Sequence, residues 1–155
     1  MSLSDHFTLL ELTKSQTASR LGIDNTPDDF VIGNLASLCD EILEPIRNAF
    51  GVPFSPSSGY RCEELNRLIG GSPNSAHCLG LAVDIELPLA RVSNIELARW
   101  CRDNLVYDQL ILECWQPDEG DNSGWVHIAD SIGDPRGDVL TYRRGRTYIE
   151  GLPDE

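Results

Sequence analysis

The amino-acid sequence predicts an α+β domain in which a small central antiparallel sheet is flanked by helices. From residue 27 to residue 50, apolar side chains recur every three or four positions, which is typical of an amphipathic helix. Residues 81–86 instead have Leu81, Val83 and Ile85 on one face, and residues 109–114 have Leu110, Leu112 and Cys114 on one side, which is typical of half-buried strands. Helices and short strands alternate along the chain, which favours α+β over a doubly wound sheet.

Length and composition predict one domain spanning residues 1–155. The chain has 41% hydrophobic and 24% charged residues, as in ordinary globular proteins. The formal net charge of −13 argues against nucleic acid or an anionic membrane as a partner, because phosphate binding depends on clustered Lys and Arg. The first residues lack a secretory signal pattern, and no apolar stretch approaches the length of a membrane span. We therefore expect cytoplasmic synthesis without a signal peptide, and no membrane insertion.

The first half of the chain is expected to be mainly helical scaffold. Residues 1–27 are mixed and loop-like, with one short helical turn at 8–12. The amphipathic pattern at 27–50 predicts a long helix behind the site. Pro45 lies inside that pattern and predicts a kink or break, because proline cannot donate a helical hydrogen bond.

The remaining elements are short and separated by turn-rich segments. Strands are predicted at residues 52–55, 81–86, 109–114, 124–129 and 139–142. Helices are predicted around Leu65 and Leu68 and at residues 91–104. The strands at 109–114 and 124–129 are expected to pair as an antiparallel hairpin. Residues 151–155 are expected to be a frayed tail.

Three residues are candidate metal ligands: His77, Asp84 and His127. Neutral imidazoles and carboxylates bind zinc well, and a catalytic zinc site needs three protein ligands and an open position. Asp84 alternates with the apolar residues of its strand and so points away from the apolar layer. From spacing alone, ordinary hydrogen-bonded side chains remain an equal alternative. His6 lies outside every motif and is expected to be an exposed terminal residue.

Three sequence blocks carry a family resemblance. They are S-G-Y-R at 58–61, S-x-H-x-x-G-x-A-x-D at 75–84 and W-V-H at 125–127. They resemble the signature blocks of the zinc D-Ala-D-Ala carboxypeptidases, peptidase M15, and most closely its small phage and prophage branch. Shorter matching blocks extend the resemblance over about residues 7–130. It implies a D-Ala-D-Ala peptidase/Hedgehog-like fold, with one Zn²⁺ held by His77, Asp84 and His127 in a cleft on one sheet face.

Amide hydrolysis also needs a group that takes a proton from water and delivers it to the leaving amine. Some relatives place a glutamate three residues before the last histidine, but this position is Gly124 here. The resemblance to the phage branch implies Glu113 instead, which the predicted hairpin places on the same side as His127. An exposed strand carboxylate is the alternative. The rival acids Asp118, Glu119 and Asp121 lie on a connection that would hold them less firmly.

The resemblance also implies a catalytic and substrate-positioning role for Arg61. A guanidinium can bind a substrate carboxylate through two hydrogen bonds or steady a developing oxyanion. A surface ion pair is the alternative for a lone arginine. Ser75 and Gln109 are further candidate substrate contacts. Tyr60 and Trp125 are expected either to wall the cleft or to pack in the core.

The predicted function is a zinc metallopeptidase that hydrolyses amide bonds in peptidoglycan stem peptides or D-amino-acid dipeptides, as a carboxypeptidase or an endopeptidase. A phage or prophage role would fit release to the cell wall by lysis machinery or carriage in a virion, and a cytosolic enzyme on recycled muropeptides would fit equally. The first alternative is a non-catalytic zinc-binding module of the same fold. The second is a cysteine hydrolase using Cys78 or Cys114, although five cysteines without C-x-x-C spacing indicate mostly reduced packing thiols.

Overall fold

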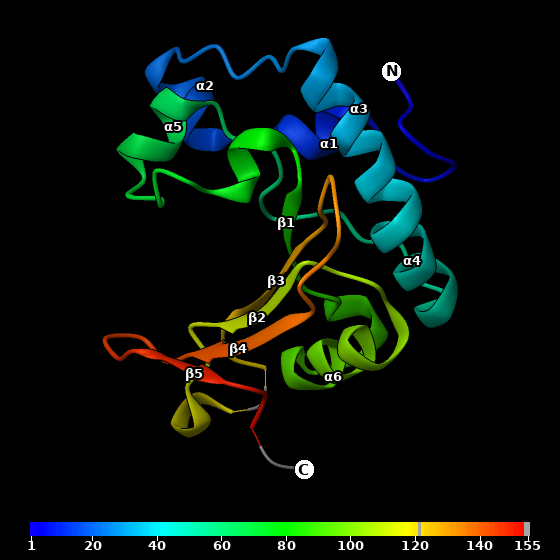
Figure 1. Cartoon of the computed structure of the whole chain (residues 1–155), viewed down its shortest axis with the longest axis vertical. Coiled ribbons are helices and arrows are strands. Elements are labelled where there is room, and N and C mark those ends of the chain that lie inside the picture. The colour runs from blue at the N-terminus through cyan, green and yellow to red at the C-terminus, as the bar shows by residue number, and fades with distance from the viewer. Residues whose placement is uncertain (121, 154–155) are drawn as a thin grey trace.

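The computed structural model describes residues 1–120 and 122–153, and its central feature is a five-stranded sheet (Figure 1). The strands, in the spatial order β1-β3-β2-β4-β5, are β1 (Ala82–Ile85), β3 (Trp125–Ala129), β2 (Gln109–Glu113), β4 (Asp138–Tyr142) and β5 (Tyr148–Glu150). The predicted α+β class and the β2–β3 hairpin are confirmed.

One strand pair departs from the predicted antiparallel sheet. β4 runs parallel to β2, whereas the other pairs are antiparallel. The cause is the short connection at 130–137. β3 ends beside Gln109, and β4 begins at the same edge of the sheet, with Asp138 opposite Gln109. β4 therefore has to run in the direction of β2.

Helices fill most of the N-terminal half and recur once between β1 and β2. They are α1 (Leu9–Thr13), α2 (Gln16–Leu21), α3 (Asp29–Leu38), α4 (Glu44–Phe50), α5 (Glu63–Leu68) and α6 (Asn94–Asn104). α2 was not predicted. It is short, but Ser15 caps its first turn by accepting a hydrogen bond from the Ala18 amide, and Gly22 ends it in the left-handed conformation.

The predicted helix at 27–50 is present, and its irregularity lies one turn before Pro45. Residues Cys39–Leu43 form a π-helical turn between α3 and α4. Pro45 has no N–H to donate to the carbonyl four residues earlier. The π turn accommodates this missing hydrogen bond, and the helix continues.

The predicted strand at 52–55 is wrong. These residues are not hydrogen-bonded into the sheet, and the contact with β1 is made slightly later, by Ser57 and Ser58. The Ser57 amide donates to the Asp84 carbonyl, and the Asp84 amide donates to the Ser58 carbonyl, each at 2.9 Å. The S-G-Y-R segment therefore lies directly against β1.

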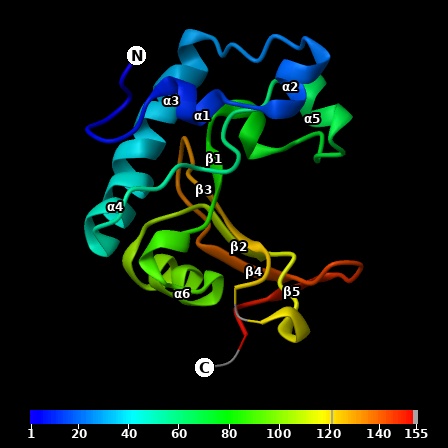
Figure 2. The same ribbon diagram turned by 180° about the vertical axis from the view of Figure 1, so that it is seen from behind.

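The two faces of the sheet have opposite roles. Val83, Leu110, Leu112, Val126 and Ile128 point into the hydrophobic core. That core also contains apolar residues of α3, α4 and α6, and α6 lies against the sheet in both Figure 1 and Figure 2. The other face carries the alternate residues of β1, β2 and β3, and this face holds the site.

The C-terminal segment is docked onto the molecule as far as Pro153. The Gly151 amide donates to the Val139 carbonyl at 2.8 Å, and Arg99 donates to the Pro153 carbonyl at 3.1 Å. The expectation of a frayed tail therefore does not hold for Gly151 to Pro153. Residues 154–155 lie outside the described residues. Within the described residues, no helix is long and apolar enough to cross a membrane.

Candidate metal centre

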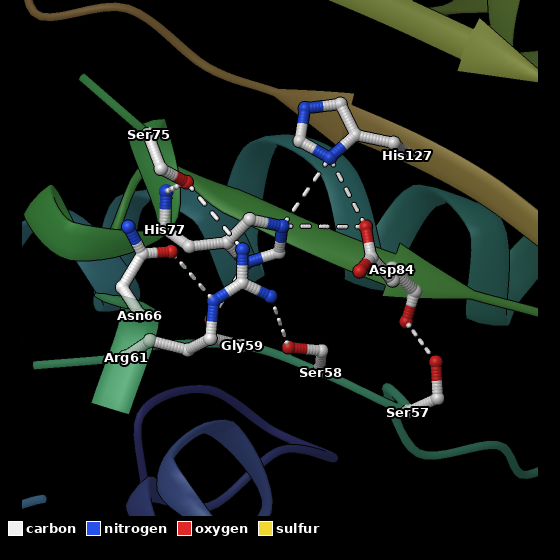
Figure 3. Close-up of polar contacts among 9 residues, drawn as sticks. All are labelled: Ser57, Ser58, Gly59, Arg61, Asn66, Ser75, His77, Asp84 and His127. Atoms are coloured by element: carbon white, nitrogen blue, oxygen red, sulfur yellow. Dashed lines mark hydrogen bonds and ion pairs between the residues drawn. The ribbon is translucent and has the colours of Figure 1, made fainter. Parts of the chain in front are cut away.

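Three side chains from separate elements converge on the open face of the sheet. β1 and β3 are paired so that Asp84 lies directly opposite His127. His77 comes from η2, a 3₁₀ turn at Ala76–Leu79. Figure 3 shows the two imidazoles and the carboxylate pointing toward one another. The structure therefore brings together the three predicted ligands.

The facing atoms of this triad form a compact triangle. His77 Nε2 lies 3.3 Å from both Asp84 Oδ1 and His127 Nδ1, and His127 Nδ1 lies 3.0 Å from Asp84 Oδ1. Tetrahedral zinc with ligand bonds of about 2.0–2.1 Å separates its ligand atoms by about 3.3 Å. The triangle thus has the size that a zinc ion requires.

The hydrogen bonding of His77 prepares its Nε2 as a ligand atom. His77 Nδ1 lies 2.7 Å from the Gly59 carbonyl oxygen, which can only accept. Nδ1 therefore carries the proton, and Nε2 of the neutral ring presents its lone pair to Asp84 and His127. Converging lone pairs and a carboxylate repel one another unless a cation lies between them. The donor set of this structure therefore fits a divalent metal ion.

Local backbone features fix His77 in this position. Ser75 caps η2 by accepting from the His77 amide, and Gly80 ends the turn in the left-handed conformation. A side chain on Gly59 would overlap the Leu12 carbonyl, which explains why the S-G-Y-R segment needs glycine to pass α1 closely.

Asp84 is ionised in this environment. Burial alone would raise its pKa, but in the metal-free site protons on the facing imidazoles of His127 and His77 outweigh burial and hold the pKa far below its ordinary value. A metal ion bound by the lone pairs of both imidazoles would take the place of those protons beside the carboxylate. An ionised carboxylate is the form that binds a metal ion.

Glu113 lies on the same sheet face as His127. It is paired with Trp125, which precedes His127 by two residues in β3. It lines a cavity of about 690 Å³ together with the triad. Burial is the largest influence on its pKa and raises it, the charge of Asp84 adds to the rise, and His127 opposes it. A half-buried carboxyl group with a raised pKa suits proton transfer in both directions near neutral pH.

The neighbouring Gly124 explains why a glutamate is absent three residues before His127. Gly124 has a φ of +71°, and a side chain there would overlap the backbone carbonyl of Glu113. The close approach of the two strands therefore excludes an E-x-x-H glutamate at this position, and Glu113 is the acid that the hairpin presents to the cavity.

Arg61 lies beside the triad and is held by its neighbours. Its Nε donates to Asn66 Oδ1 at 3.2 Å, Nη1 donates to the Ser58 hydroxyl at 3.0 Å, and Nη2 donates to the Ser75 hydroxyl at 3.5 Å (Figure 3). Burial lowers its pKa while the charge of Asp84 raises it. A guanidinium has five N–H groups, so two remain for a ligand in the cavity.

The other predicted contacts divide into two groups. Ser75, Gln109 and Trp125 line the cavity, although the Gln109 amide group also donates to Asp138 at 3.0 Å. Tyr60 lines a separate, smaller cavity and packs against the core, so the structure supports core packing rather than a cleft wall.

The rival candidates lie away from the triad. Asp118 and Glu119 are exposed on the 3₁₀ turn η4 (Pro117–Glu119) and do not line the triad's cavity, and Asp121 lies outside the described residues. His6 binds Glu44 at 2.7 Å near the N-terminus. Burial raises the pKa of the Cys78 and Cys114 thiols, which is the opposite of what a cysteine nucleophile needs.

Sequence patterns missed two residues of the site. Asn66 is buried and accepts a hydrogen bond from Arg61, but it lies outside the three sequence blocks that indicate the site. Tyr148 lines the cavity from β5, a strand that was not predicted. The Asn66 contact depends on how the chain turns into α5, and the place of Tyr148 depends on strand pairing, and local periodicity reveals neither.

The fold and the convergent triad define a candidate metal-dependent hydrolase. The chain belongs to the peptidase M15 family, since the family model described as Peptidase M15 matches residues 5–129. The match confirms the predicted family and covers every residue of the triad as well as Arg61 and Glu113. A search of the curated proteins finds no match to the chain.

Proposed function

We propose that this protein is a zinc-dependent peptidase that hydrolyses amide bonds in bacterial cell-wall peptides, as a carboxypeptidase or an endopeptidase. The observation that carries the proposal is the triangle of ligand atoms, 3.0–3.3 Å apart, on the wall of a cavity that also contains Glu113. Membership of the peptidase M15 family supports the peptidase activity.

One Zn²⁺ would be held by His77 Nε2, Asp84 Oδ1 and His127 Nδ1. Bound there, zinc would supply a Lewis acid that activates water near neutral pH and polarises the scissile carbonyl. The buried hydrogen bond from His77 Nδ1 to the Gly59 carbonyl fixes the tautomer and orientation of the ring for this role.

Glu113 would act as general base and then as general acid. Its carboxylate would take the proton from the attacking water, and the resulting carboxyl group would donate that proton to the leaving amine nitrogen. Its position on the same sheet face as His127 supports this assignment. Its raised pKa is closer to neutral pH than that of an ordinary glutamate. Uptake of the proton from water and its release to the amine are therefore both easier.

Arg61 would position the substrate. The guanidinium is fixed by hydrogen bonds to Asn66, Ser58 and Ser75. Its remaining N–H groups are therefore held in fixed directions. A carboxylate or carbonyl oxygen of a peptide is the matching acceptor. Ser75, Gln109 and Trp125 line the same cavity and would contact the rest of the peptide.

The biological setting is proposed from the resemblance of the motif blocks to the phage and prophage branch. We propose that the peptidase acts in phage lysis or entry, reaching the wall through lysis machinery or within a virion. Peptidoglycan stem peptides and D-amino-acid dipeptides are the proposed substrates.

The test is digestion of purified muropeptides by zinc-loaded protein, with products identified by mass spectrometry. We expect one type of amide bond to be cleaved. Glu113→Gln should lower kcat by roughly 10²–10⁴-fold while retaining zinc, because only proton transfer is removed. Glu119→Gln, which changes an exposed acid away from the triad, is the matched control and should retain activity.

A zinc-loaded, folded parent that cleaves no muropeptide and no D-amino-acid dipeptide would contradict the proposal. It would favour the alternative of a non-catalytic zinc-binding module. Thiol alkylation should leave activity intact, since the Cys78 and Cys114 thiols have raised pKa values.

A further inference from the structure

The C-terminal segment completes the cavity although it lies beyond the family match. The family model ends at residue 129, yet Ser131, Ile132, Arg136 and Tyr148 line the cavity together with the triad. Tyr148 is the first residue of β5. This strand is held at the sheet edge by its antiparallel pairing with β4.

The sheet register places Tyr148 on the face that carries Glu113. β2 and β4 run in parallel with Leu112 opposite Thr141, so Tyr142 follows beside Glu113. Tyr142 is in turn directly opposite Tyr148. Residues directly opposite in a sheet project to the same side, and therefore Glu113, Tyr142 and Tyr148 form one row across the sheet.

The Tyr148 side chain is half-exposed, and one ring contact orients it along the row. Its ring packs on the Tyr142 ring, with centroids 4.7 Å apart and planes inclined by 31°. Tyr148 and Glu113 line the same cavity, and the influence of Tyr148 on the Glu113 pKa favours the charged carboxylate and partly offsets the effect of burial. The Tyr148 pKa is raised, first by burial and then by the charge of Glu113.

Glu113 needs such support because it is the last residue of β2. The next residue, Cys114, leaves the strand with a φ of +51°. A glutamate side chain has several rotatable bonds, and an unsupported carboxylate samples positions away from the triad. A proton-transfer group has to be held within a fraction of an ångström of its working position.

We propose that Tyr148 is a positioning residue of the active site, whose hydroxyl holds the Glu113 carboxylate facing the metal centre. This inference rests on the proposed function of Glu113 as the proton-transfer group. It makes the C-terminal hairpin of β4 and β5 part of the active site and not merely an edge of the sheet.

The first test compares Tyr148→Phe with Tyr142→Phe. The two substitutions remove the same hydroxyl from neighbouring rings, but Tyr142 does not line the cavity. Tyr148→Phe should lower kcat by about 10- to 100-fold, as expected for a lost hydrogen bond to a charged group, with KM changed less than about twofold. Tyr142→Phe should keep the kcat of the parent.

The second test measures the contact without any turnover. The protein is labelled with ¹³C at the Cζ atom of its four tyrosines, and Tyr148→Phe identifies the Tyr148 resonance. In metal-free protein at neutral pH, Glu113→Gln should shift that resonance, since its hydrogen-bond acceptor loses its charge. The resonance of Tyr107, buried in the core, is the internal control.

The two tests separate this inference from the proposed function. A Tyr148 resonance that does not respond to Glu113→Gln would overturn the contact even in an active enzyme. A Tyr148→Phe variant with the kcat of the parent would overturn the positioning role. If the parent cleaves no peptide, the proposed function fails, while the resonance shift still decides whether Tyr148 holds Glu113.

Discussion

Glu113 is a half-buried carboxyl group beside the ionised Asp84, and this environment sets its contribution to stability. Its folded pKa is raised above the ordinary value of 4.5, with burial as the main cause. The folded state therefore binds this proton more tightly than the unfolded state does. The contribution of Glu113 to stability is favourable at low pH and is lost as pH rises from 4.5 through the raised folded pKa.

Replacing Glu113 by Gln should therefore stabilise the metal-free protein at pH 7. The gain should shrink toward pH 4, where the parent carboxyl group is also neutral. Urea unfolding of parent and variant at both pH values measures this difference. The control is Glu119→Gln, at an exposed position. A Glu113→Gln variant that is destabilised to the same extent at both pH values would show that the carboxyl group is not under strain.

Gly124 is a second residue whose identity is determined by its surroundings. Its left-handed φ of +71° and the closeness of the Glu113 carbonyl both exclude a side chain. Gly124→Ala should lower the free energy of unfolding by roughly 1–3 kcal/mol. Gly133→Ala is the matched control, because its added methyl group would meet nothing within 4 Å and its φ is not left-handed. Equal stability of the two variants would contradict this account of the missing E-x-x-H glutamate.

At the scale of single elements, α6 supports the sheet from the side opposite the site. Ser93 begins this helix with a capping box, in which its hydroxyl accepts from the Glu96 amide and the Glu96 carboxylate accepts from the Ser93 amide. Ser93→Ala should lower stability by about 1 kcal/mol. Chemical denaturation checks this, with Ser19→Ala on exposed α2 as the control. A variant as stable as the parent would mean that the cap is dispensable.

The elements that the sequence predicted well are those with a clear local pattern. In β1, β2 and β3 every second residue is a buried apolar one, so the facing of Asp84, Glu113 and His127 followed from the period of two. α2 and β5 escaped prediction because each is too short for its pattern to rise above the turn signals around it. The parallel placement of β4 depends on where β3 ends in space, which no local pattern encodes.

The same distinction applies to the candidate site. The proposed ligands could be predicted because family blocks and strand facing agreed on His77, Asp84 and His127. Their supports could not, since the hydrogen bond of Arg61 to Asn66 and the proposed support of Glu113 by Tyr148 both depend on the folded chain. Tyr60 belongs to the S-G-Y-R block, yet it packs against the core. A sequence block can thus contain a packing residue as well as residues of the site.

At the scale of the whole molecule, the triad joins two neighbouring elements, η2 and β1, to β3, where His127 lies 43 residues after Asp84. η2, β1 and β3 meet at His77, Asp84 and His127. A metal ion that binds only this folded arrangement would stabilise the entire fold, by about 2.7 kcal/mol when its free concentration is 100 times Kd. Zinc binding is therefore the central claim, on which the proposed chemistry of Glu113 and Arg61 depends.

The most direct test is the metal content of protein purified without chelator, measured by mass spectrometry beside the variants His127→Ala and His6→Ala. We expect close to one zinc ion per chain in the parent and in His6→Ala, since His6 binds Glu44 away from the triad. His127→Ala should lose the zinc, because it removes one of three ligands. A folded parent that contains no zinc and cannot be loaded with it would contradict the metal centre and the peptidase mechanism built on it.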